Sequence, residues 1–297
     1  MKKAFIQLHI AVFLAGFTAI LGKLIALNEE LLVWYRMLIT AITLTLLLYF
    51  KKELKKLPFK ITITIFGVGA LVAFHWLCFY GSIKYSNVSV SLTCFSAVGF
   101  FTAIFDPLIK KKKIDLVEVF FGLLTIAGIY LIFDFYPQYK LGIVFGIISA
   151  LLASIFPILN KDLLKIVSAE TLTLYEMIGG FLALTLIFPF YLKLFPAKYY
   201  WPTVTDWLWL LVLAWLCTVL SFILQLNALK KISAFTSSLT YNLEPIYGIV
   251  LAFIIFHENK FLGPGFYYGL GLIFLAVILQ MGREAYKSKK YRQVSSQ

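Results

Sequence analysis

The sequence has few charged residues and few cysteines, and each shortage excludes a class of protein. Only 14% of its 297 residues are charged, whereas soluble domains carry about a quarter. So few charged side chains do not coat a globule of this size, and we expect lipid to surround most of the surface. The three cysteines, Cys78, Cys94 and Cys217, lie inside apolar runs without CxxC spacing. They indicate neither a disulfide framework nor a metal site.

In place of charge, the sequence has a succession of long apolar runs. A helix that crosses a membrane needs about 20 apolar residues, and these runs lack the period-2 alternation of a barrel. The first run follows Lys2 and Lys3 and exceeds a signal-peptide core, so we expect a first helix rather than a cleaved leader. The predicted fold class is all-α, a polytopic membrane protein with ten transmembrane helices. The expected spans are Phe5–Leu27, Leu31–Phe50, Ile61–Ile83, Val88–Ile109, Leu116–Phe133, Leu141–Leu159, Leu172–Leu194, Trp207–Leu229, Phe235–Phe256 and Gly265–Met281.

Basic residues outnumber acidic ones, 27 to 14, which gives a formal net charge of +13. The lysines form short clusters between apolar runs, such as Lys110–Lys113, which predicts membrane orientation rather than nucleic-acid binding. The bias places both termini in the cytoplasm and the chain in the cytoplasmic (inner) membrane. Residues 283–297 are expected to form a basic cytoplasmic tail that touches anionic lipid. The expected partners are the lipid bilayer and a small-molecule substrate, and the sequence leaves the oligomeric state open.

The two halves of the chain resemble each other. The matching segments are Ser86–Thr93 with Ser233–Thr240, Tyr35–Met37 with Tyr175–Met177, and Lys23 with Lys161. Their consistent order predicts two five-helix repeats, residues 1–138 and 139–282. Because five is odd, the second repeat starts from the other side of the membrane, so the repeats are inverted in topology. Many secondary transporters share this plan, although some channels do too.

The pattern resembles the drug/metabolite transporter superfamily, specifically its EamA-type ten-helix exporters. The residues that carry the resemblance are Tyr35–Arg36, Ser233–Leu239, Glu244–Pro245, His257–Glu258 and Gly269–Ile273. The first half departs from it, because Ala97–Val98 occupies the Glu-Pro position. The resemblance implies secondary active export of amino acids or similar metabolites by alternating access. It also implies a cavity lined by helices 1, 3 and 4 and their counterparts 6, 8 and 9.

Charged groups at membrane depth are costly, so each needs a reason. Glu244 precedes Pro245 in the middle of an expected helix, where it either titrates or binds a substrate amine, or serves as a structural carboxyl. Arg36, expected about one turn inside its helix near the outer surface, either binds a substrate carboxylate or snorkels and pairs with another helix. Its repeat counterpart, Glu176, is a candidate gate contact. His75 either lines the cavity or is a hydrogen-bonded interior group.

Other polar and aromatic side chains at membrane depth complete the candidate set for substrate binding or coupling. They are Trp76, Tyr80, Trp215, Gln225, Tyr241 and Asn242. Serines, threonines and glycines in the helices are expected mainly to allow close helix packing.

No catalytic or metal motif accompanies these candidates. His257-Glu258 lacks the second zinc histidine of HExxH, because position 261 is Phe. The sequence also has no GxSxG elbow and no phosphate-binding loop of the Walker type. We therefore expect no cofactor, no metal and no enzyme activity. The alternatives left open are an intramembrane enzyme and a channel-like membrane protein.

Overall fold

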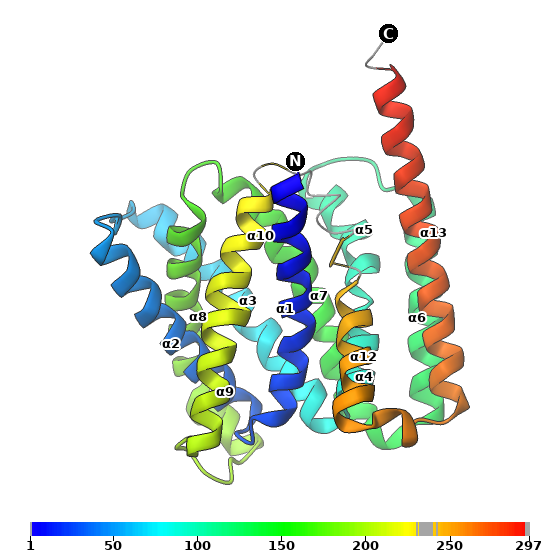
Figure 1. Ribbon diagram of the computed structural model, residues 1–297, viewed down its shortest axis with the longest axis horizontal. Coiled ribbons are helices and arrows are strands. Elements are labelled where there is room, and N and C mark those ends of the chain that lie inside the picture. Colours follow the sequence, from blue (N-terminus) through cyan, green and yellow to red (C-terminus); the bar gives the residue numbers. More distant parts are fainter. Residues whose placement is uncertain (1, 230, 232–239, 242, 295–297) are drawn as a thin grey trace.

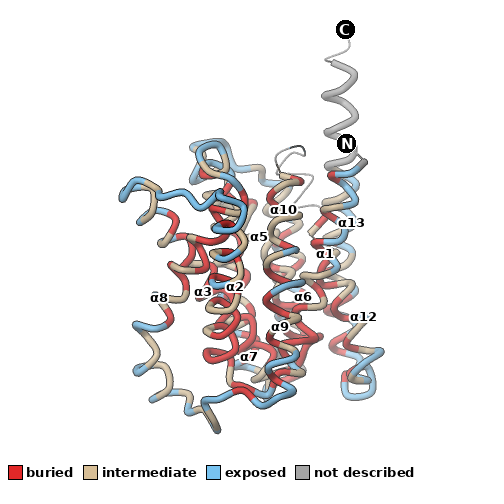
Figure 2. Tube along the Cα trace, turned by 60° about the vertical axis from the view of Figure 1, so that its left-hand side comes forward, coloured by how far each residue is buried: buried red, intermediate tan, exposed pale blue. Residues whose placement is uncertain are grey.

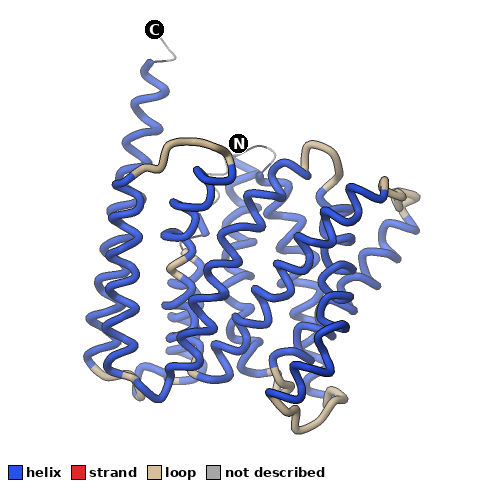
Figure 3. Tube along the Cα trace, turned by 180° about the vertical axis from the view of Figure 1, so that it is seen from behind, coloured by secondary structure: helices blue, strands red, loops and turns tan. Residues whose placement is uncertain are grey.

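The computed structural model describes residues 2–229, 231, 240–241 and 243–294. This part of the chain is a bundle of helices without a strand, which confirms the all-α prediction (Figures 1 and 3). The first helices are α1 (Lys2–Leu24), α2 (Glu29–Phe50), α3 (Phe59–Tyr85), α4 (Val88–Phe95), α5 (Val98–Ile109) and α6 (Leu116–Phe135). The second half contains the turn η1 (Pro137–Tyr139), α7 (Lys140–Leu163), α8 (Ala169–Leu194), α9 (Val204–Ala214), the π-helix η2 (Trp215–Leu220) and α10 (Ser221–Leu229). After α10 come α12 (Glu244–Phe256), the turn η3 (Glu258–Lys260) and α13 (Pro264–Val294).

Most helices run the length of the bundle. Eight spans in the described residues are long and apolar enough to cross a membrane, and Leu116–Ile132 and Glu244–Phe256 are shorter apolar helices. α1 begins and α13 ends at the same end of the bundle (Figure 1), which we call the terminal end. α1 ends and α2 begins at the opposite end. Buried positions gather where helices face one another, and exposed positions mark many of the loops (Figure 2).

Side-chain caps explain why several helices begin where they do. The side chains of Asn28, Asn87 and Ser168 each accept a hydrogen bond from a backbone N–H of the first turn that follows. Thr203 and Asp206 form a reciprocal capping box at the start of α9. Such caps satisfy N–H groups that have no partner inside the helix.

Two of the expected helices differ from their predicted form. The span Val88–Ile109 is broken at Ser96–Ala97 into α4 and α5. The ninth expected helix, Phe235–Phe256, includes residues outside the described part, Ser233–Leu239 and Asn242 among them. Its described helix, α12, starts at Glu244 with Pro245 in the first turn. Pro245 therefore lies in the first turn of α12, where its missing N–H costs nothing.

Small residues bring the backbones of neighbouring helices together. α3 and α8 meet at Gly69 and Gly180, where a Cβ on Gly180 would lie 2.6 Å from the Gly69 carbonyl oxygen. α6 and α13 meet in the same way at Gly128 and Gly269 and form a pair at one edge of the bundle (Figure 1). This is the packing expected between helices in lipid.

Candidate functional site

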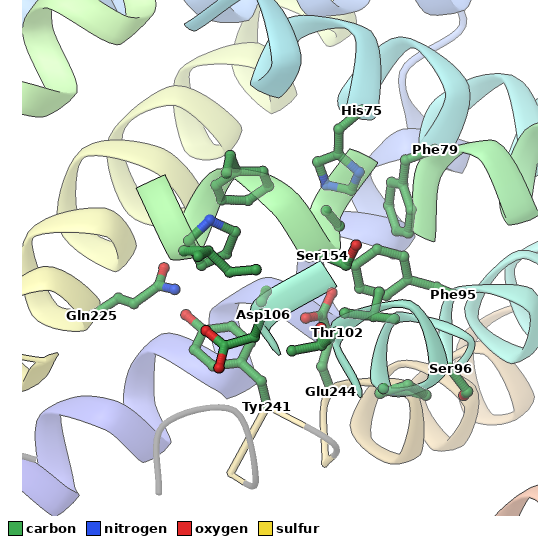
Figure 4. A pocket seen from close by; sticks show the side chains of 18 of the residues that line it. His75, Phe79, Phe95, Ser96, Thr102, Asp106, Ser154, Gln225, Tyr241 and Glu244 are labelled. Atoms are coloured by element: carbon green, nitrogen blue, oxygen red, sulfur yellow. The ribbon is translucent and has the colours of Figure 1, made fainter. Parts of the chain in front are cut away.

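A cavity of about 440 Å³ lies inside the bundle (Figure 4). Its inner boundary includes Arg36 on α2 and Cys217 on η2, and its mouth includes Lys110, Lys112 and Lys161. These three lysines lie where α5 and α7 reach the terminal end. The cavity therefore opens toward the terminal end, and its lining stops short of the opposite end.

Arg36 marks the inner end of the cavity and is only 1% exposed. Its Nε donates to Thr218 Oγ1 at 2.7 Å, and its Nη1 donates to the Tyr80 hydroxyl at 2.7 Å. Its Nη2 donates to the carbonyl oxygen of Cys217 at 3.3 Å. The guanidinium also lies over the Trp76 ring, with 3.6 Å between Cζ and the ring centroid. Cation–π contact and neutral hydrogen bonds thus hold this cation in place.

His75 lies in an aromatic wall along one side of the cavity. Its Nδ1 is 2.9 Å from the hydroxyl and 3.1 Å from the carbonyl oxygen of Ser149 on α7, which fixes the ring. The ring stacks on Phe95 with centroids 5.4 Å apart, and Phe79 and Phe156 lie at 6.1 and 5.7 Å. This wall offers apolar and aromatic contact to a bound molecule.

Glu244 lies on the far side of the cavity from His75 in Figure 4 and is 7% exposed. It is the first residue of α12, and Thr102 and Ser154 line the same space. α1 approaches it closely, since a Cβ on Gly16 would lie 3.0 Å from the Glu244 carbonyl oxygen. The cavity therefore contains one buried cation and one buried carboxyl group, carried by different helices.

The mouth carries several charges, and its acidic residues Asp106 and Glu118 were not among the candidates from the sequence. Asp106 on α5 pairs with Lys110, and the Glu118 carboxylate lies 3.5 Å from Arg283. Lys161 lines the mouth from α7. The sequence contains one feature that could have identified Asp106, because this residue directly precedes Pro107 inside a helix. The sequence does not indicate that Phe79, Phe95 and Phe156 line a cavity, because lipid-facing aromatic residues occur in the same sequence context.

The opposite end of the bundle is closed by a buried carboxylate. Glu258 Oε2 accepts hydrogen bonds from Ser89 N (2.8 Å) and Ser89 Oγ (2.6 Å) at the start of α4. Glu258 Oε1 accepts from Val88 N at 3.1 Å and pairs with Lys23 Nζ at 2.8 Å. One side chain thus ties α4, α1 and the turn after α12 together.

A second carboxylate closes the same end from the side of α9. Asp206 accepts hydrogen bonds from the Ala26 N–H at 2.7 Å, from Thr203 Oγ1 at 2.7 Å and from the Tyr199 hydroxyl at 3.0 Å. Burial, and then the Asp206 carboxylate, raise the pKa of the Tyr199 hydroxyl to about 12. Tyr199 therefore remains a donor at neutral pH, and the loop between α1 and α2 stays attached to α9.

The structure brings most of the predicted site residues together. The predicted residues that line the cavity are Arg36, His75, Trp76, Gln225, Tyr241 and Glu244. Tyr80 contacts it through Arg36. Arg36 differs from expectation, because it is buried two turns inside α2 instead of lying near the surface. The lining also includes α2, α6 and α13, beyond the helices that the family resemblance implied.

Three predicted residues do not belong to the described cavity. Trp215 is 48% exposed on the outer surface and donates through Nε1 to Thr43 Oγ1 at 3.0 Å. Glu176 is buried on α8, where its carboxylate oxygens form no hydrogen bond at normal distance and the Asn160 side chain is a polar neighbour. Asn242 lies outside the described residues. Among the residues that the structure describes, no group of His, Cys, Asp and Glu could hold a metal ion.

Comparison with known proteins gives one family and several relatives. The model of the EamA-like transporter family matches residues 2–134 and 140–282. The uncharacterized transporter YetK of Bacillus subtilis is 26% identical, with 95% of this chain and 89% of that protein covered. An uncharacterized transporter of Clostridium kluyveri is 22% identical over 87% of both chains. A protein of known crystal structure shares the fold, with a TM-score of 0.63, 15% identity and 94% and 97% of the two chains covered.

Proposed function

The chain belongs to the EamA-like transporter family, and we propose that it exports amino acids or similar small metabolites. Membership of this family makes it a multi-pass membrane transporter and not an enzyme. In this proposal the protein is a secondary active transporter of the cytoplasmic membrane, and it works by alternating access. The observation that carries it is a cavity that opens at one end only and contains a buried cation and a buried carboxyl group. A channel, in contrast, requires a path open at both ends at once.

The proposed topology is ten crossings in two inverted halves. The eight long spans, together with the shorter α6 and α12, would make the ten. The halves are residues 1–138 and 139–282, followed by the tail 283–297, and the two consecutive family matches support this division. Arg36 lies seven positions after the first residue of α2, and Glu176 seven after that of α8. Equal positions on helices that run in opposite directions are what inverted repeats require.

The proposed orientation gives the cavity a direction. With both termini in the cytoplasm, as the loop charges favour, the mouth faces the cytoplasm. The hydrogen-bonded opposite end then faces outward, and the conformation described above is the inward-open one. Export would require the contacts around Glu258 and Asp206 to break while the mouth closes.

Transport itself is tested in liposomes that contain the purified protein and a panel of amino acids. We expect saturable, counter-flow-stimulated efflux of one or a few members of the panel. A folded protein that moves no metabolite would refute the transporter proposal. Flux that rises linearly with concentration would favour a channel.

Glu244→Gln tests the cavity carboxyl group, which we assign to binding a substrate amine or a coupling proton. A charged hydrogen bond contributes about 1.5–3 kcal/mol, so we expect transport to fall roughly 10- to 100-fold and its pH dependence to flatten. Glu53→Gln, in an exposed loop, is the matched control and should transport normally. Unchanged rate and pH profile in Glu244→Gln would exclude the titrating or binding role.

A further inference from the structure

Arg36 is a buried cation that forms no ion pair with any residue in the described part of the chain. Residues 230–242, some of which lie outside the described part, contain neither Asp nor Glu. Glu244 lines the same cavity without pairing with the guanidinium. A buried charge without compensation is unfavourable, so an anion from elsewhere would stabilise this site.

The guanidinium has donors left for such an anion. It carries five N–H groups, and three hydrogen bonds use one on each nitrogen, to Thr218, Tyr80 and Cys217. One N–H therefore remains on each terminal nitrogen. A guanidinium can use N–H groups on two of its nitrogens to bind the two oxygens of one carboxylate.

The surrounding helices hold these donors in a fixed position. Thr218 Oγ1 donates to the carbonyl oxygen of Leu213 at 2.8 Å, inside the widened turns of the π-helix η2. The Tyr80 ring packs against α1 so closely that Gly22 has no room for a Cβ. π-Helical turns often occur at functional sites, and a fixed donor set lowers the cost of binding.

We propose that Arg36 and its neighbours form a carboxylate-binding subsite at the inner end of the cavity, and that the transported molecule supplies the missing countercharge. This inference rests on the proposed transport function and names its substrate class. The substrate carries a free carboxylate, which enters first and lies nearest the closed end. Its amine then lies toward Glu244, and Lys112 and Lys161 at the mouth attract the carboxylate on its way in.

The experiment measures binding separately from flux. Purified wild-type protein in detergent is titrated with each amino acid of the panel, with its amide and with its decarboxylated amine, and thermal stabilisation is recorded. Sodium acetate and inorganic phosphate are titrated in parallel. We expect at least one amino acid to stabilise the protein, and its amide and amine to bind at least tenfold more weakly. Equal binding of acid and amide, stabilisation by phosphate alone, or no stabilisation by any carboxylate would overturn the subsite.

Variants assign the preference to Arg36. Arg36→Gln should bind acid and amide alike, and Arg36→Lys, which keeps the charge without the planar fork, should retain part of the preference. Lys193→Gln, at an exposed position on α8, is the control and should behave as wild type. A full preference in a folded Arg36→Gln protein would overturn the assignment. Binding without flux would refute the transport proposal but leave the carboxylate subsite standing. Flux without a preference for the acid would refute the subsite but leave the transport proposal standing.

Discussion

Replacing Gly69 by leucine is expected to prevent the protein from folding. A Cβ at this position would overlap the backbone carbonyl of Glu176 on α8. No rotation of a side chain relieves an overlap with backbone, so α3 and α8 would have to separate along their contact. Overpacking costs about 1–3 kcal/mol even where side chains can adjust, and we expect more here. The measurement is the yield of monodisperse protein in size-exclusion chromatography, together with its thermal unfolding midpoint in detergent.

Gly67 provides a matched control two residues away on the same helix. It is exposed, and nothing lies within 4 Å of a Cβ built there. Gly67→Leu should therefore express and unfold like wild type, since the leucine would meet lipid. If Gly69→Leu folds as well as Gly67→Leu, the close contact between α3 and α8 is not what holds these helices together.

Much of the fold could be predicted from the sequence, because lipid imposes a length and a composition on every crossing helix. The expected span Leu31–Phe50 differs from α2 by two residues at its start and none at its end. The break at Ser96–Ala97 could not be predicted, because Val88–Ile109 as a whole is as long and apolar as an unbroken crossing helix. The π-helix η2 was hidden for the same reason. Both depend on contacts between helices, which a hydropathy pattern does not contain.

The candidate site was predictable where a residue is both polar and deep. Arg36, His75 and Glu244 stood out because each is costly in lipid, and all three line the cavity. Trp215 was misplaced because an aromatic residue suits lipid and a cavity equally well, and it lies on the outer surface. Polarity thus located the site, whereas the direction in which each apolar side chain faces required the packed structure.

Replacing Glu258 by alanine is expected to open the closed end of the cavity. Its carboxylate is buried and accepts hydrogen bonds from Val88 and Ser89 and pairs with the partly exposed Lys23. Its removal leaves the buried N–H groups of Val88 and Ser89 without an acceptor, and a buried donor without a partner costs about 1–3 kcal/mol, which would shift the balance between the closed and open states by roughly 10- to 100-fold. Because Val88 and Ser89 donate their backbone N–H groups to Glu258, hydrogen–deuterium exchange at these two amides reports the loss directly. We expect exchange there to accelerate strongly and net transport to fall, since a state closed at this end is one of the two that the proposed alternating access needs.

Asp162→Asn distinguishes this role of Glu258 from a general effect of removing an ion pair. Asp162 pairs with Lys165 at the surface, where the two side chains are 68% and 71% exposed, and such pairs contribute about 0–1 kcal/mol. This variant should leave exchange at Val88 and Ser89 unchanged. Lys23→Met should produce a smaller acceleration than Glu258→Ala, because the Lys23 side chain is partly solvated and Glu258 would keep its backbone donors. Slow exchange at both amides in Glu258→Ala, or equal acceleration in Asp162→Asn, would show that the closed end is held by other contacts, such as those of Asp206.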